Sequence, residues 1–112
     1  MKKIRKLSRK RDQRQALLKG LAANLILKGK IRTTEAKAKE VRPLVERLVT
    51  KAKAGDFNST RYAAKILPAK AVGRLIKEVA PRYVDRSGGY TRIVKLGLRR
   101  GDGVRVAIIE FI

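Results

Sequence analysis

The fold is decided by the C-terminal stretch YTRIVKLGLRRGDGVRVAIIEFI, residues 90–112. Its two flanks, Tyr90–Leu96 and Val104–Ile112, are rich in β-branched and aromatic residues, which favour strands. The segment Gly97–Gly103 between them contains three glycines and an aspartate, a composition typical of a turn. This stretch therefore predicts a C-terminal β-hairpin.

Upstream of the hairpin, the apolar residues recur at helical spacing. The strongest pattern is expected to begin at Thr33 or Thr34 and to end at Gly55; its apolar positions are Val41, Val45, Leu48, Val49 and Ala52. Pro43 lies inside it and predicts a kink or a join near Arg42. Two shorter helices are expected to follow, one capped by the cluster Asn58–Thr60 and stopped by Pro68, the other stopped by Pro81.

The first helix is expected to begin at Asp12, because Gln15 three residues later completes a capping-box pattern, and to end at Gly29. Lys30–Thr33 predicts a brief strand. The fold class is therefore α+β: about four helices, then a C-terminal β-hairpin that forms a small sheet with the short early strand. We expect residues 1–12 to form a basic N-terminal arm and residues 13–112 to form a single α+β domain.

The charge of the chain indicates its partner. Lys and Arg total 30 against nine Asp and Glu, which gives a net charge of +21 in 112 residues. Such a chain repels itself unless a polyanion neutralises it, and nucleic acid does so while releasing its own counterions. Nucleic acid is thus the expected partner.

The composition argues against an enzyme. The sequence contains no Cys and no His, which removes thiolate chemistry, the commonest metal ligand and the commonest general base. The nine acids are scattered, so no catalytic site, metal site or cofactor is expected.

The sequence also indicates where the protein is found. The basic start is not followed by the apolar run of a signal peptide, and no segment is long enough to span a membrane. We expect a cytoplasmic protein with no membrane or small-molecule partner and no homo-oligomer.

Four groups of residues are candidate RNA contacts, and most members are cations that pair with phosphates or stack on bases. The groups are the arm (Lys2, Lys3, Arg5, Lys6, Arg9, Lys10, Arg11 and Arg14), the start of the second helix (Arg32, Thr33, Thr34 and Lys37), the glycine loop (Arg82, Arg86, Gly88, Gly89, Tyr90 and Arg92) and the hairpin tip (Arg99 and Arg100). We expect the arm to become ordered only against phosphates, because eight cations within fourteen residues repel one another.

For two of these groups, the glycine loop and the start of the second helix, a purely structural role is an alternative to RNA contact. Tyr83 and Tyr90 offer faces for stacking on unpaired bases, but Tyr90 can also pack in the core. The hydroxyls near the start of the second helix can hold a phosphate, or they can cap the helix while Glu35 pairs with Lys39. The sequence leaves both alternatives open.

Several motifs resemble one known family, that of bacterial large-subunit ribosomal protein seventeen. The matching segments are Arg5-Lys6-Leu7, Ile31-Arg32-Thr33-Thr34, Ala36 to Pro43, Gly88-Gly89-Tyr90-Thr91-Arg92-Ile93 and Ala107 to Glu110, and the resemblance runs from about residue 4 to the C-terminus. It departs from the family pattern at Lys3, Ser8, Gln13 and Arg105; the histidines usual in the family's arm are absent.

The resemblance implies a non-enzymatic structural constituent of the large ribosomal subunit in the cytoplasm. It implies binding to large-subunit ribosomal RNA, contact with neighbouring ribosomal proteins, including protein thirty-two, and no cofactor. The alternative is a nucleoid-type or regulatory DNA-binding protein with a helix-turn-helix in the first half. Against it, the connection Lys28–Thr34 is longer than the usual turn of that motif.

Overall fold

The computed structural model describes the backbone of residues 2–112 and the side chains of residues 11–112. It contains the helices α1 (Lys2–Lys28), α2 (Glu35–Ala54), α3 (Phe57–Ile66) and α4 (Ala69–Arg74), and the strands β1 (Lys30–Thr34), β2 (Thr91–Leu98) and β3 (Arg105–Phe111). After α4 the chain continues through a π-helical turn, Leu75–Val79, and a 3-10 turn, Ala80–Tyr83. The expected α+β class, with four helices and a late hairpin, is confirmed.

The three strands form one antiparallel sheet in the order β1-β3-β2. The early strand β1 pairs along its whole length with β3, from Lys30 opposite Glu110 to Thr34 opposite Val106. β2 pairs with the other edge of β3, and its register shifts between Lys95 and Gly97. The prediction that an early strand joins the C-terminal hairpin is therefore confirmed.

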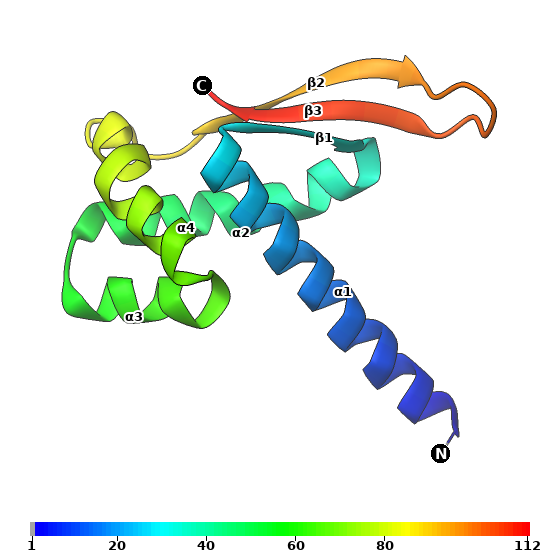
Figure 1. Ribbon diagram of the computed structural model, residues 1–112, viewed down its shortest axis with the longest axis horizontal. Coiled ribbons are helices and arrows are strands. Elements are labelled where there is room, and N and C mark those ends of the chain that lie inside the picture. The colour runs from blue at the N-terminus through cyan, green and yellow to red at the C-terminus, as the bar shows by residue number, and fades with distance from the viewer. Residues whose placement is uncertain (1) are drawn as a thin grey trace.

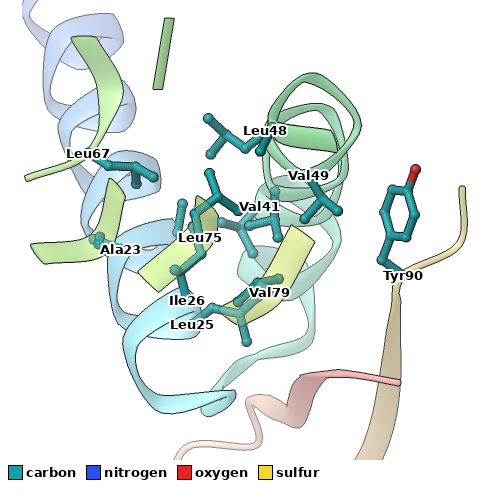
Figure 2. Packing of buried hydrophobic residues seen from close by; sticks show 14 of the residues in the cluster. Ala23, Leu25, Ile26, Val41, Leu48, Val49, Leu67, Leu75, Val79 and Tyr90 are labelled. Carbon is teal, nitrogen blue, oxygen red and sulfur yellow. The ribbon is translucent and has the colours of Figure 1, made fainter. Parts of the chain in front are cut away.

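The core lies between the sheet and the helices. Helix α2 contacts all three strands and α1, and its buried face consists of Ala38, Val41, Val45, Leu48, Val49 and Ala52. Figure 2 shows Val41, Leu48 and Val49 of this face in one cluster with Leu25 and Ile26 of α1 and with Leu75 and Val79 of the turn that follows α4. Each fully buried side chain of this size stabilises the fold by about 1.5–3 kcal/mol, which explains how a chain this basic remains folded.

Two parts of the chain extend from this body. Figure 1 shows the first half of α1 pointing away from the other helices and the distal end of the hairpin extending past the start of α2. Among the residues with described side chains, the first fully buried residue of α1 is Ala22, and partial burial begins at Leu18. In the described part of these extensions Arg11, Arg14, Arg99 and Arg100 are exposed.

Several expected boundaries were wrong. Helix α1 begins at Lys2, and Asp12 lies inside it instead of capping it, because residues 2–11 contain no Gly or Pro and are rich in good helix formers. Helix α2 runs through Pro43 without a join. The cap of α3 is Asp56, whose carboxylate accepts from the Ser59 amide at 2.7 Å, and not the cluster Asn58–Thr60.

The last two corrections concern the second half of the chain. Pro81 does not stop the fourth helical segment: it lies at the start of the 3-10 turn, where its missing N–H costs no hydrogen bond. Strand β2 extends to Leu98, so Gly97 belongs to the strand at its register shift and not to the turn. Gly97 has φ of 97°, a left-handed conformation that glycine adopts easily.

Candidate nucleic-acid interface

The basic helix α1 carries the first group of predicted contacts. Arg11 and Arg14 are exposed, and Arg14 forms a two-pronged ion pair with Glu40 of α2, with nitrogen–oxygen distances of 2.7 and 3.1 Å. The other predicted side chains of this group, Lys2, Lys3, Arg5, Lys6, Arg9 and Lys10, lie outside the described ones. The structure places their backbone in the part of α1 that extends from the body.

At the start of α2, the capping interpretation is confirmed. The Thr34 hydroxyl accepts from the Lys37 amide at 3.2 Å, and Glu35 pairs with Lys39 at 3.2 Å. Glu35 also lies 3.7 Å from Lys95 of β2. The hydrogen bond from Lys39 is the main cause that lowers the pKa of Glu35, and the charge of Lys95 adds to it. Arg32 and the Lys37 ammonium remain exposed beside this corner.

The glycine loop connects the 3-10 turn to β2 and presents two predicted cations. Arg82 and Arg86 are exposed, and Gly89 has φ of 63°. The Glu46 carboxylate on α2 accepts from the Gly89 amide and, at 2.9 Å, from the Thr91 hydroxyl. Burial alone would raise the pKa of Glu46, but these hydrogen bonds and the nearby Arg42 bring it below its ordinary value.

The two tyrosines of this region are core residues, which is the structural alternative that the sequence left open for Tyr90. Tyr83 is 4% exposed and Tyr90 is fully buried, and their ring centroids lie 5.2 Å apart. Figure 2 shows the Tyr90 ring beside α2, and its hydroxyl lies 3.0 Å from both the Thr50 hydroxyl and the Lys53 ammonium. Burial would raise the pKa of Tyr90, but these two hydrogen bonds lower it.

The surface around β1 carries two cations that the sequence analysis missed, Lys28 and Lys30. Lys30 and Arg32 of β1 lie on the side of the sheet opposite Ile31, which packs against the core. Together with Lys28 and Asn24 they line a shallow hollow that contains no acid. Arg92, a predicted contact, is paired with Glu110 at 2.7 Å on the same face. The signal for Lys28 and Lys30 was the spacing Lys28-x-Lys30-x-Arg32, which runs from the end of α1 into β1.

At the hairpin tip, the two predicted arginines differ. Arg99 is held by Asp102 through a 2.6 Å ion pair, and the same carboxylate accepts from the Val104 amide. The hydrogen bond from Arg99 is the main cause that lowers the pKa of Asp102. Arg100 is exposed and has no ion-pair partner among the described side chains, so it is the available cation of the tip.

The predicted residues do not form one compact patch. Figure 1 places the start of α1, the start of α2 and the hairpin tip toward one end of the molecule, and the glycine loop toward the other. Within residues 11–112 there is no cluster of acids suited to a metal ion, and no helix in the described chain is long and apolar enough to cross a membrane. The arrangement is suited to contacting an extended polyanion at several points.

Comparison with known proteins gives the family. The model of the family "Ribosomal protein L17" matches residues 17–112. Two proteins named large ribosomal subunit protein bL17, from Exiguobacterium sp. and Thermoanaerobacter sp., are 50% and 51% identical to this chain. Each alignment covers 96% of this chain and 97% of the relative. The protein of that name from Campylobacter jejuni is 50% identical, over 96% of this chain and 93% of its own length. Because the matches span nearly the whole of both chains, the chain belongs to the ribosomal protein L17 family.

Proposed function

We propose that this protein is a structural, non-enzymatic constituent of the large ribosomal subunit that binds and stabilises large-subunit ribosomal RNA. The observation that carries the proposal is the membership of the ribosomal protein L17 family, whose relatives are named as large-subunit proteins. The same membership supports a location in cytoplasmic ribosomes and contact with neighbouring ribosomal proteins, among which we include protein thirty-two.

The distribution of charge supports RNA as the direct partner. Among residues 11–112, seven ion pairs engage Arg14, Lys39, Arg42, Arg74, Arg92, Lys95 and Arg99, and most of the other basic side chains are exposed. Exposed cations without an acidic partner keep their full attraction for phosphate. We assign the RNA contacts to the arm of α1, to Lys28, Lys30, Arg32 and Lys37, to Arg82 and Arg86 beside the glycine pair, and to Arg100.

We leave the two tyrosines out of these contacts because their rings are buried, and the ion pairs limit the role of some arginines. Arg14, Arg92 and Arg99 are held in ion pairs. Each of these arginines can contact a phosphate only if it binds the phosphate and its carboxylate together, or if the ion pair breaks. Gly88 and Gly89 allow a close approach of the backbone, while the Gly89 amide is already bonded to Glu46.

The test is sedimentation of a tagged copy in a sucrose gradient after a high-salt wash of the lysate. Simple phosphate attraction falls steeply with salt, whereas a protein built into folded RNA should stay with the large subunit. Purified protein should also prefer large-subunit RNA to small-subunit RNA and to duplex DNA of equal mass. Release to the top of the gradient together with equal affinity for duplex DNA would favour the DNA-binding alternative.

A further inference from the structure

The glycine loop is tied to helix α2 by one carboxylate. Glu46 accepts three hydrogen bonds from the end of the loop. The donors are the Gly89 amide at 3.2 Å, the Thr91 amide at 3.2 Å and the Thr91 hydroxyl at 2.9 Å. Thr91 is 1% exposed, so these bonds lie at the edge of the core. Arg42, one turn before Glu46, lies 3.7 Å from the same carboxylate and donates to the Thr91 carbonyl.

A second set of contacts ties the other end of the loop to the same helix. The Lys53 ammonium donates to the Arg86 carbonyl and to the Tyr90 hydroxyl, which also meets Thr50. The positions 42, 46, 50 and 53 follow helical spacing and therefore lie along one face of α2. The loop is thus held at both ends by a polar stripe on α2 that lies beside the helix's buried face.

What is held in place is the part of the loop that presents cations. Arg82, Arg86, Ser87 and Gly89 are exposed, and the loop contains the adjacent glycines Gly88 and Gly89, which have no side chain to pack. A glycine-containing loop without such ties samples many conformations, and binding must then pay the entropy of ordering it. A loop already fixed at Gly89 and Arg86 binds without that cost.

We infer that Glu46 is a positioning residue for RNA binding, because it holds the glycine loop in its RNA-binding conformation before RNA arrives. The inference rests on the proposed function and adds a role for an acid inside a basic surface. Electrostatics alone gives the opposite sign: removing a carboxylate close to Arg42 and the loop raises the positive charge and should strengthen binding to any polyanion. The two explanations therefore make opposite predictions for one substitution.

The test compares Glu46→Gln with Glu78→Gln. Both changes replace a carboxylate by an amide and raise the net charge by one, but Glu78 is exposed, pairs only locally with Arg74 and does not contact the loop. Affinity for large-subunit RNA is measured across a salt series, well below the melting temperature of each variant. We expect Glu78→Gln to bind at least as tightly as the unmodified protein and Glu46→Gln to bind about tenfold more weakly, since tenfold corresponds to a modest ordering cost.

Two further measurements separate positioning from a general loss of structure. The salt slope of Glu46→Gln should equal that of the unmodified protein, because the bound state keeps the same phosphate contacts. Amide exchange on the free variant should speed up at Gly89 and Thr91 and stay unchanged in the core of α2. If Glu46→Gln folds poorly, Thr91→Val removes one of the three hydrogen bonds at nearly constant volume and should weaken binding less, in the same direction.

Binding of Glu46→Gln as tight as that of Glu78→Gln would overturn the inference, as would unchanged exchange at Gly89 and Thr91. Failure of the proposed function looks different, because then the unmodified protein itself shows no preference for large-subunit RNA. The behaviour of the unmodified protein tests the function, and the difference between the two variants tests the role of Glu46.

Discussion

Removing charge from the start of α1 should weaken RNA binding without destabilising the fold. The substitution is Lys2→Gln, Lys3→Gln and Lys6→Gln together, which keeps the length of the helix and uses a residue of good helix propensity. Among the described side chains, α1 first packs against the core at Leu18, so the core should be unaffected and each substitution should change the free energy of unfolding by no more than about 0.5 kcal/mol.

The expected loss of affinity follows from the number of cations removed. The salt slope is the fall of the logarithm of the binding constant with the logarithm of the salt concentration. Each phosphate contact contributes about 0.7 to this slope on single strands and about 0.9 on duplex, so three contacts account for a slope of about 2–3. With the affinity at 1 M salt unchanged, that difference corresponds to about 100- to 1,000-fold weaker binding at 0.1 M salt. A salt series of fluorescence anisotropy with large-subunit RNA measures both quantities.

A matched variant separates a local contact from overall attraction. Lys65→Gln, Lys70→Gln and Lys77→Gln also remove three charges, from exposed positions on α3, α4 and the π-helical turn that are not among the proposed contacts. We expect this variant to lose less than about threefold in affinity and to keep the salt slope. Equal losses for the two variants, or an unchanged slope for the α1 variant, would refute the assignment of these lysines to phosphates.

Three more predictions concern Tyr90, Ile109 and Glu46. Tyr90→Phe removes a hydroxyl bonded to Thr50 and Lys53, so it should cost about 1 kcal/mol, measured by urea denaturation; no change in stability would contradict the contribution of these hydrogen bonds. Ile109→Ala, at a fully buried position of β3, should cost about 2–5 kcal/mol in the same assay, and a loss below 1 kcal/mol would show a loosely packed sheet. The pKa of Glu46 is lowered in the folded protein from its ordinary value of 4.5. Ionised Glu46 therefore contributes fully to the free energy of unfolding above pH 4.5, and this contribution is lost as the pH falls through the lower pKa of the folded protein. The amide shift of Gly89 should therefore titrate with a midpoint below 4.5, and Glu46→Gln should abolish that titration; a midpoint at or above 4.5 would contradict the hydrogen bonds to the carboxylate.

The periodic elements could be predicted from the sequence, because their signals are local. The apolar spacing of Val41 to Ala52 predicts α2, and the β-branched runs around the glycines predict the hairpin. The start of α1 could not be predicted, because a cap at Asp12 and a continuous helix from Lys2 satisfy the same local rules. Pro81 misled for a related reason: a proline that ends an α-helix is equally suited to the first turn of a 3-10 segment.

The candidate site could be predicted only in part, because charge is visible in the sequence and pairing is not. Arg100 and Arg99 are neighbours with the same side chain, yet only Arg99 is held by Asp102. Glu46 was one of nine scattered acids, and its role depends on residues more than forty positions away. The burial of Tyr90 likewise depends on contacts with α2 that no local pattern encodes.

Helix α2 links the fold to the proposed interface. Its apolar face packs against α1 and the sheet, and its polar stripe holds the glycine loop through Glu46 and Lys53. The two faces belong to one rigid element, so the position of the loop relative to the sheet is fixed by the same packing that stabilises the core. A core substitution that shifts α2 should therefore weaken RNA binding through the loop even when no cation is lost. By the same reasoning, an acid in this basic protein should strengthen RNA binding where the affinity gained by fixing the positions of the cations exceeds the affinity lost by reducing the positive charge.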